Sequence, residues 1–238
     1  EEELVKYSDR IRFTSEFRDA VYKANMLIIC NEVFELEPGK CDLTGFYVTL
    51  KECCRQIQND VIVVIRSTVP VGTNREVKDF MMNLTNHNYK INVVSNPEFI
   101  SQGTAIKDML QPSRIVVGLT TRSAQLAMKE LYADFDCPLL IVSPESAELI
   151  KYASNAYLAV KVSYINEIAD LCESVKADIQ EVSYGIGLDP RIGQKYLSSG
   201  IGFGGPWLTQ DTRVLMQTAK NNNVRLRVLE AAMHANER

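Results

Sequence analysis

Short apolar runs alternate with helical stretches over residues 1–142. The runs are rich in Val, Ile and Leu, and each is followed by polar or turn residues, a pattern typical of buried parallel strands. They cover residues 10–13, 26–30, 61–65, 91–94, 114–118 and 138–142. Between them, helical patterns cover residues 15–23, 43–57, 73–84 and 122–134. This alternation predicts an α/β domain over residues 1–142, with an open parallel sheet and crossover helices.

The pattern changes from Pro144 onward, where almost no strand signal remains. Apolar residues then recur at steps of three and four, at Ile150, Ala153, Tyr157, Val160, Tyr164, Ile168, Leu171 and Val175. This stripe predicts one long amphipathic helix over 144–175, which Ser143 would cap and Pro144 would begin. A helix of this length would span ~45 Å, more than a small domain needs internally. The stripe favours two interpretations equally: a helix that pairs with a second copy, and a core helix of one subunit.

Three further helices are predicted, over 178–186, 210–220 and 224–236, so residues 143–238 form an all-helical domain. The last helical pattern runs to the end of the chain without a stop signal. We therefore expect the natural protein to continue beyond it.

Composition and charge exclude several classes of protein. The 238 residues carry a net charge of −4, and the basic residues are scattered, which does not suit a nucleic-acid partner. No apolar run approaches the ~20 residues of a membrane helix, and the acidic N-terminus is not a signal peptide. The six cysteines form no C-x-x-C pair, and only two histidines are present. These features predict a cytoplasmic protein with reduced, mostly structural thiols and no metal site.

Four segments carry residues that suit chemistry. Residues 66–73 and 95–99 each follow a strand, which places hydroxyls and Glu98 at the carboxyl edge of the sheet, where ligands bind. Residues 148–155 place Lys151 and Asn155 on one helix face, where together they could stabilise an oxyanion. Residues 200–211 hold four glycines in six positions, then Trp207 and Asp211. Taken alone, each segment is better explained as a plain turn, a surface residue or a packing residue.

Taken together and in this order, the segments resemble the UDP-glucose/GDP-mannose dehydrogenase family, and within it most of all the bacterial UDP-glucose dehydrogenases. The resemblance runs from about residue 9 to the end of the chain. Seven motifs carry it: S-T-V-P-V-G-T at 67–73, N-P-E-F at 96–99, G-T-A-I-K-D at 103–108, E-L-I-K-Y-A-S-N-A-Y-L-A at 148–159, N-E-I-A at 166–169, D-P-R-I-G at 189–193 and G-F-G-G at 202–205.

The resemblance implies NAD-dependent oxidation of a sugar's primary alcohol to a carboxylate, through a thioester on a cysteine. It implies a UDP-sugar substrate, UDP-glucose foremost. We also expect a homodimer through the 144–175 helix, on the ground of its apolar stripe. The matching catalytic positions are Lys151, Asn155, Asp211, Glu98 and Thr68. The positions implied to hold the nucleotide sugar are Glu98, Phe99, Lys151, Asn155, Arg191, Tyr196 and Gly204. The positions implied to face NAD are Thr68, Gln102, Asn31 and Gln210.

Several positions depart from the family pattern. Trp207 occupies the place of the catalytic cysteine, and Gln210 that of a lysine near the cofactor. Gln102 stands where the family usually has a glutamate, and Asn31 with Glu32 where it has a threonine-proline turn. A thiolate is the nucleophile that captures the aldehyde, so its loss should stop formation of the acid.

Whole regions of the family pattern also have no counterpart. The chain holds no G-x-G-x-x-G turn after a strand, so we expect weak NAD binding, and we expect it to lack the C-terminal nucleotide-sugar domain. Without the two strands that precede it in the family, the 10–13 run would lie roughly 14 Å from its neighbour. We therefore predict that residues 10–13 are displaced or pair abnormally.

The sequence leaves three interpretations open. One is a nucleotide-sugar dehydrogenase impaired in catalysis. The second is a non-catalytic module that dimerises or binds a sugar nucleotide, and the third is a degraded or partial copy.

Overall fold

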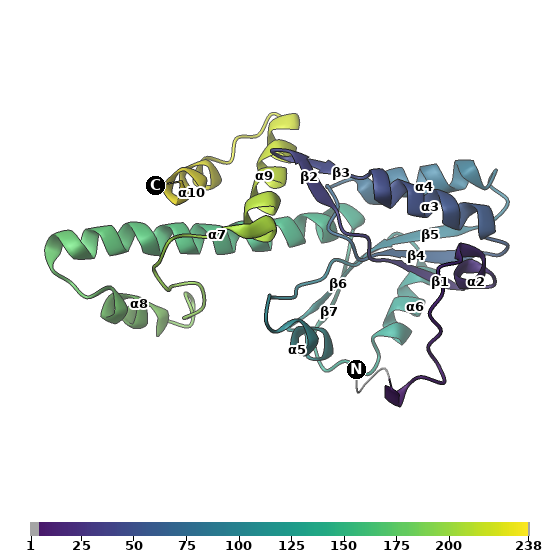
Figure 1. The fold of residues 1–238 in the computed structure, drawn as a ribbon, viewed down its shortest axis with the longest axis horizontal. Helices are drawn as coiled ribbons and strands as arrows, with labels where there is room; N and C mark the ends of the chain where they lie inside the picture. The colour runs from purple at the N-terminus through teal and green to yellow at the C-terminus, as the bar shows by residue number, and fades with distance from the viewer. Residues whose placement is uncertain (1–4, 238) are drawn as a thin grey trace.

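A computed structural model describes residues 5–237, so residues 1–4 of the acidic N-terminal stretch lie outside the described part of the chain. A five-stranded sheet has the order β1-β4-β5-β6-β7 (Figure 1). Its strands are β1 (Met26–Ile29), β4 (Val61–Ile65), β5 (Ile91–Ser95), β6 (Ile115–Gly118) and β7 (Leu139–Val142). A helical region follows the sheet, which confirms the predicted fold class of an incomplete Rossmann-like sheet followed by a helical domain.

The sheet is mixed, so the expectation of a fully parallel sheet is wrong for one junction. β1, β4 and β5 are parallel, as are β6 and β7, but β6 pairs antiparallel with β5 at the single position Ser95–Gly118. The chain leaves β5 at its carboxyl end and forms α5 (Ala105–Leu110) before β6. It therefore enters β6 from beyond that edge and runs in the opposite sense.

Residues 10–13 form no strand, so the strand predicted from their apolar pattern is wrong, while their predicted displacement from the sheet is confirmed. They lead into the short helix α2 (Phe17–Val21), which is shorter than the predicted 15–23. β1 is consequently an edge strand, paired only with β4.

A hairpin that the hydrophobic pattern did not predict follows β1. It consists of β2 (Phe34–Glu37) and β3 (Lys40–Asp42), paired antiparallel. Its strands are too short and too exposed to bury an apolar run, which is why they escaped prediction. The Pro38-Gly39 turn between alternating residues was the available signal.

Helices cover both faces of the sheet. On one face α3 (Thr44–Gln56) and α4 (Thr73–Leu84) pack Phe46, Leu50 and Met81 against the strands. On the other face α6 (Arg122–Leu131) packs Ala124 and Met128. These helices agree with the predicted ranges within a few residues. The adjacent Cys53 and Cys54 both lie buried on α3, and burial raises the pKa of each thiol to about 11.

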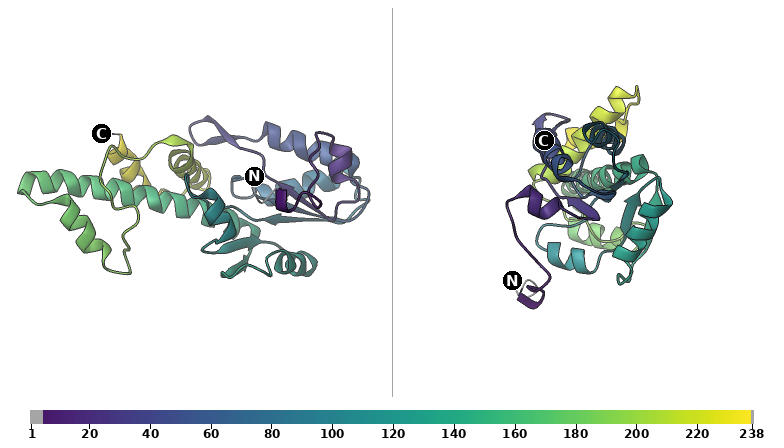
Figure 2. Two further views of the ribbon diagram at one scale, coloured as in Figure 1. Left: turned by 60° about the horizontal axis from the view of Figure 1, so that its bottom comes forward. Right: turned by 90° about the vertical axis from the view of Figure 1, so that its right-hand side faces the viewer.

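The long predicted helix exists as α7 (Pro144–Val175), 32 residues long. Ser143 Oγ caps its start by accepting a hydrogen bond from the Ser146 N–H at 3.2 Å. Gly118 allows α7 to dock on the sheet, because a Cβ there would stand 2.7 Å from the Ala147 Cβ. The first turns of α7 thus lie at the sheet, and the remainder extends well beyond it (Figures 1 and 2).

Three helices accompany the extension of α7. They are α8 (Ile179–Gly187), α9 (Gly205–Asn221) and α10 (Arg227–Asn236), and α9 and α10 pack along α7. α9 begins five residues earlier than predicted. Trp207, Gln210 and Asp211 therefore lie in its first two turns, and not in an irregular glycine-rich loop. Within residues 5–237, no helix combines the length and the apolar character needed to cross a bilayer.

Candidate functional site

The start of α4 is already occupied by a carboxylate of the chain itself. Glu148 Oε2 accepts a hydrogen bond from the Gly72 N–H at 2.7 Å, and its Oε1 accepts from the Asn74 N–H at 2.9 Å and the Ser95 hydroxyl at 3.1 Å. Gly72 adopts φ +102°, which only glycine reaches without strain. Helix N-termini attract anions, so Glu148 fills the anion site that the 66–73 segment offered and ties α7 to the sheet.

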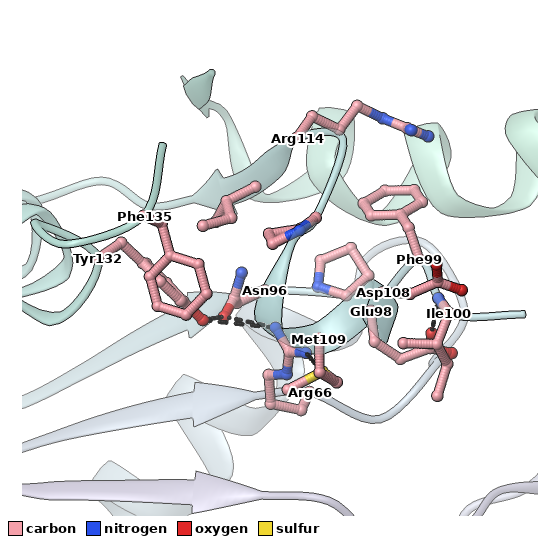
Figure 3. Close-up of a pocket in the computed structure, with 13 residues that line it drawn as sticks. Arg66, Asn96, Glu98, Phe99, Ile100, Asp108, Met109, Arg114, Tyr132 and Phe135 are labelled. Carbon is pink, nitrogen blue, oxygen red and sulfur yellow. Dashed lines mark hydrogen bonds between the residues drawn. The ribbon is translucent and has the colours of Figure 1, made fainter. Parts of the chain in front are cut away.

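Asn96, the first residue after β5, has a structural role. Its side chain is fully buried, its Nδ2 donates to the Val116 carbonyl at 2.8 Å, and its Oδ1 accepts from the Tyr132 hydroxyl and from Arg66 Nη1 at 3.1 Å (Figure 3). This network joins the end of β5 to β6 and fixes the turn that carries Glu98.

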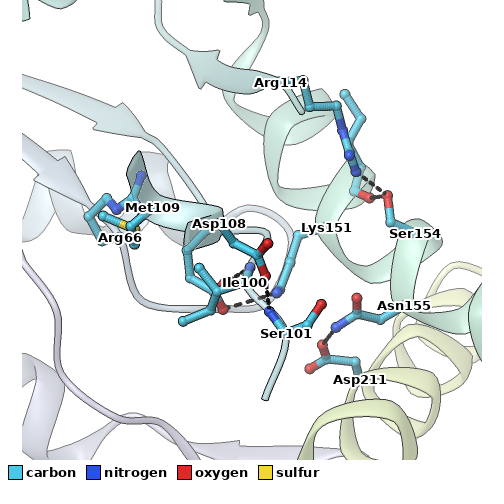
Figure 4. A network of polar contacts seen from close by, with 12 residues as sticks. Arg66, Ile100, Ser101, Asp108, Met109, Arg114, Lys151, Ser154, Asn155 and Asp211 are labelled. Atoms are coloured by element: carbon cyan, nitrogen blue, oxygen red, sulfur yellow. Dashed lines mark hydrogen bonds and ion pairs between the residues drawn. The ribbon is translucent and has the colours of Figure 1, made fainter. Parts of the chain in front are cut away.

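Two polar pairs lie at the junction of the sheet edge with α7 and α9 (Figure 4). Lys151 is buried, and its Nζ lies 3.0 Å from Glu98 Oε1. One turn further along α7, Asn155 Nδ2 donates to Asp211 Oδ2 at 2.6 Å. The two partners of each pair lie more than fifty positions apart in the sequence, and the fold brings the four predicted groups together.

Burial raises the pKa of Asp211 to about 6, although the hydrogen bond from Asn155 and the charge of Lys151 oppose this shift. A carboxyl group that titrates close to neutral pH can both accept and release a proton, which suits general acid-base chemistry. The Lys151 ammonium and the Asn155 amide are donors suited to an oxyanion. The cluster is therefore capable of chemistry at a polarised carbonyl.

A first cavity, of about 490 Å³, opens at the carboxyl end of β1 and is called the β1 cavity here. Its charged lining residues are Glu32, Glu98, Asp211 and Arg66. The predicted Asn31, Thr68 and Gln210 also line it, with Cys30 and Trp207. Thr68 in addition borders a small pocket that Lys151 lines.

A second cavity, of about 630 Å³, lies beside α7 and is called the α7 cavity here. The predicted residues Phe99, Asn155, Tyr196 and Gly204 line it. Gln102, predicted to face a cofactor, lies on this cavity and not on the β1 cavity. Tyr196 reaches its position with φ +63°, an unusual backbone angle for a non-glycine residue. Trp207 lines both cavities and is 44% exposed.

Two predicted site residues line neither cavity: Lys151, which lines only the small pocket that Thr68 borders, and Arg191, which lies away from all of these spaces. Its guanidinium forms a forked pair with the Asp189 carboxylate, with N–O distances of 2.5 and 3.0 Å, and the side chain is 88% exposed. Within one chain it does not join the other site residues.

Sequence reasoning missed Glu148 and Arg114. Glu148 lies one helical turn before Lys151 on the same face, which was the available signal. Arg114, just before β6, had none, because its neighbours come from α7 and the β5 turn. Within the part of the chain that the structure describes, no three His, Cys, Asp or Glu side chains gather as a metal site.

Known proteins resemble this chain over its whole length. The profile described as the UDP-glucose/GDP-mannose dehydrogenase family, NAD binding domain, matches residues 2–136, and that of the family's central domain matches residues 145–238. The UDP-glucose 6-dehydrogenase TuaD of Bacillus subtilis is 39% identical over 96% of this chain and 50% of its own. A UDP-glucose 6-dehydrogenase of Rhizobium meliloti is 40% identical over 97% of this chain and 54% of its own.

Solved structures agree with these matches. A UDP-glucose dehydrogenase from the archaeon Pyrobaculum islandicum superposes with a TM-score of 0.93 at 31% identity, over 99% of this chain and 55% of that one. A GDP-mannose dehydrogenase from Pseudomonas aeruginosa gives 0.75 at 29% identity, over 99% and 56%. The chain thus spans about half the length of the relatives it matches. With two family profiles covering almost every residue and Lys151, Asn155 and Asp211 gathered at one junction, this chain belongs to the UDP-glucose/GDP-mannose dehydrogenase family.

Proposed function

We propose that this chain binds a UDP-sugar, with UDP-glucose foremost, in the α7 cavity and does not complete the four-electron oxidation to the acid. One observation carries the proposal. Trp207 occupies the family's cysteine position in the first turn of α9 and lines both cavities. An indole there provides no nucleophile and stands between the two spaces that a hydride would have to connect.

The other cysteines do not supply a replacement nucleophile. Burial raises the pKa of Cys41, on β3, to about 11, so its thiol stays protonated at neutral pH. Cys53 and Cys54 lie buried on α3 with similarly raised pKa values. Cys30 lines the β1 cavity together with Asp211, but it follows β1 and does not occupy the family's cysteine position on α9, where Trp207 lies.

The β1 cavity fits the anionic part of NAD poorly. Three of its four charged lining residues are acidic, and the fourth, Arg66, already bonds to Asn96. The N-terminus of α4, which follows the lining residues Ser67 and Thr68, already holds the Glu148 carboxylate. These features support the inference that this chain binds NAD weakly, and we derive no step through the cofactor.

Residues that persist have clear tasks on a bound sugar. Lys151, which pairs with Glu98, would donate to an oxygen of the sugar's reacting end. Asp211, with a pKa of about 6, would exchange a proton there while Asn155 holds its carboxyl in place. The proposal is therefore a binding site with part of its proton chemistry retained.

Trp207 is the single tryptophan of the sequence, so tryptophan fluorescence, excited selectively over the tyrosines, reports on this site alone. We expect UDP-glucose to change that fluorescence in a saturable way, while UDP-glucose with NAD yields no sustained NADH absorbance. Sustained turnover would contradict the proposal, as would a flat titration confirmed by calorimetry.

The matched variant is Trp207→Cys, with Trp207→Ser as the control that removes the indole without adding a thiol. If the indole is the main obstacle, Cys but not Ser accumulates a covalent adduct with the corresponding nucleotide-sugar aldehyde, visible by intact mass. If neither variant forms an adduct, other departures such as Gln210 dominate.

A homodimer through α7 is a second part of the proposal, as are a cytoplasmic location and a division into residues 1–142 and 143–238. Beyond its first turns, α7 leaves Tyr157, Tyr164, Leu171 and Val175 more than half exposed, which is unusual for an unpartnered helix. We expect light scattering to give twice the chain mass, and Leu171→Lys to give a monomer. A monomeric parent chain would contradict the dimer and leave the binding proposal standing.

A further inference from the structure

The α7 cavity carries only positive charge among its described lining residues. Arg114 and Lys195 are its charged members, and no Asp or Glu lines it. The chain as a whole has a net charge of −4, so an all-cationic cavity does not follow from composition. A cavity of about 630 Å³ with this lining suits an anionic ligand.

Arg114 is held firmly but without a carboxylate. Its Nη2 donates to the Ser154 hydroxyl at 3.2 Å and its Nη1 to the Ser113 hydroxyl at 3.3 Å, and its guanidinium carbon lies 3.9 Å from the centre of the Phe99 ring (Figures 3 and 4). No acidic group lies within ion-pair distance among the described residues. Lys151, by contrast, has Glu98 at 3.0 Å.

A half-buried guanidinium without an anionic partner lowers the stability of the fold unless a bound ligand supplies the negative charge. Arg114 is half-buried, and burial lowers the pKa of its guanidinium with no opposing charge. A guanidinium has five N–H donors, and two hydroxyls engage two of them. The remaining donors form a rigid fork that matches two oxygens of a phosphate. Phe99 and Ser154 fix the plane of this fork before any ligand arrives.

Lys195 offers a second positive charge on the same cavity. It comes from the exposed segment after α8, whereas Arg114 lies at the start of β6, so the two residues belong to different parts of the chain. A flexible ammonium and a fixed guanidinium that share one cavity are suited to two linked phosphates.

We propose that Arg114, assisted by Lys195, binds the diphosphate of the nucleotide ligand in the α7 cavity. The inference rests on the proposed function for the identity of the nucleotide, while the anion site itself does not depend on it. Arg114 contacts ligand phosphate and takes no part in proton transfer.

The test is a set of Trp207 fluorescence titrations with three probes: UDP-glucose, inorganic pyrophosphate and uridine. For Arg114→Gln we expect UDP-glucose and pyrophosphate to bind about tenfold more weakly or worse, because hydrogen bonds to charged groups are lost. Affinity for uridine should be unchanged. Lys195→Gln should weaken the two anionic probes about threefold, as fits an exposed charge. Arg122→Gln on α6, which loses the same charge far from the cavity, should match the parent chain.

The outcomes separate the two proposals. If the parent chain binds pyrophosphate but not UDP-glucose, the proposed function fails and the anion site stands. If the parent chain binds neither pyrophosphate nor UDP-glucose, the proposed function and the anion site are both wrong. Equal affinities for Arg114→Gln and the parent chain would overturn the inference, as would an equal loss for uridine, because Arg114 would then act only by packing on Phe99.

Folding of the variants is checked by urea unfolding. Should Arg114→Gln not fold, Arg114→Lys decides, because it keeps the charge and loses the fork. Pyrophosphate binding that is several-fold weaker is expected for this variant, and unchanged binding overturns the inference.

Discussion

The two cavities that meet at Trp207 differ in charge and in how far their polar groups are already satisfied. The β1 cavity is mainly acidic, and its polar residues bond to the protein: Gln210 Nε2 donates to the Val33 carbonyl at 3.0 Å, and Asn31 Nδ2 to Thr49 at 3.0 Å. The α7 cavity is cationic, and Arg114 retains free donors. The polar groups of the β1 cavity are thus already hydrogen-bonded within the protein, whereas the α7 cavity retains donors that a ligand can use.

This difference between the two cavities indicates that the capacity to bind a ligand persists in the α7 cavity. Polar groups that satisfy one another contribute to stability, and a ligand must displace them, whereas fixed and unsatisfied donors favour a ligand directly. Of the positions that depart from the family pattern, Asn31 and Gln210 lie on the self-satisfied side. Lys151, Asn155 and Asp211 lie where the two sides meet.

Glu148→Ala should have the largest effect on stability. It should also remove the difference between the two cavities, because both depend on the junction between α7 and the sheet that Glu148 stabilises. The change leaves two buried N–H groups and the Ser95 hydroxyl without their acceptor, so we expect the free energy of unfolding to fall by about 3 kcal/mol or more. Urea unfolding measures it. Glu145→Ala, one turn earlier and paired with the exposed Arg75, should cost less than about 1 kcal/mol. Equal losses of unfolding free energy in the two variants would show that the hydrogen bonds of Glu148 do not stabilise the junction more than the exposed ion pair of Glu145 does.

Asp211→Asn should change the stability of the chain by an amount that depends on pH, because its carboxyl lines the β1 cavity and titrates abnormally. The folded chain holds the Asp211 proton up to a pKa of about 6, against an ordinary value of 3.8. The unfolding free energy therefore falls as pH rises from about 4 to about 6, by about 3 kcal/mol, and stays lower above that. Asp211→Asn removes this slope.

The variant should accordingly match the parent chain near pH 4 and exceed its stability at pH 8. Asp42→Asn is the control, because a hydrogen bond from Thr44 lowers the pKa of that exposed carboxyl, and no gain at pH 8 is expected. An Asp211→Asn variant that is no more stable than the parent at pH 8 would show that the carboxyl titrates normally.

Gln210→Ala should have the smallest effect on stability, and that effect should be confined to the side of the β1 cavity. It removes the bond from α9 to the Val33 carbonyl, at the entry to the β2–β3 hairpin, and should cost about 1 kcal/mol. Hydrogen exchange should rise in the hairpin and stay unchanged along α7. Gln125→Ala is the control, because its side chain accepts a hydrogen bond from Arg122 within α6 and not from the hairpin. Unaltered exchange in the hairpin would mean that other contacts, such as Arg213 with Glu35, hold this side closed.

The sequence predicted much of the fold through periodicity. All five strands of the sheet follow the predicted apolar runs within one residue at each end. α7 follows a stripe of eight residues and begins at the predicted Ser143 cap. Where the pattern was weak, prediction failed: the exposed β2–β3 hairpin carries little apolar signal, and α5 buries none of its residues. Residues 10–13 have a strand-like pattern but no neighbouring strand within the described chain.

The candidate site was predicted only as separate positions. Lys151 with Asn155 followed from helical spacing, because four residues make one turn. That Asn155 would meet Asp211 at 2.6 Å, or Lys151 would meet Glu98, depends on how α9 and the β5 turn pack on α7. Contacts of this kind join residues more than fifty positions apart, and local pattern carries no information about them.

The sequence by itself determined the family, the five strands of the sheet, the long helix and the absence of a thiol at position 207. Only the tertiary structure decided what Trp207 does, because its position between two cavities follows from α9 packing on α7 beside the sheet edge. It also decided that Glu148 fills the anion site at α4 and that Arg114 has no acidic partner. The physical reason is the same in each case: a charge acquires its role from the partners that surround it in space, and these come from elsewhere in the chain.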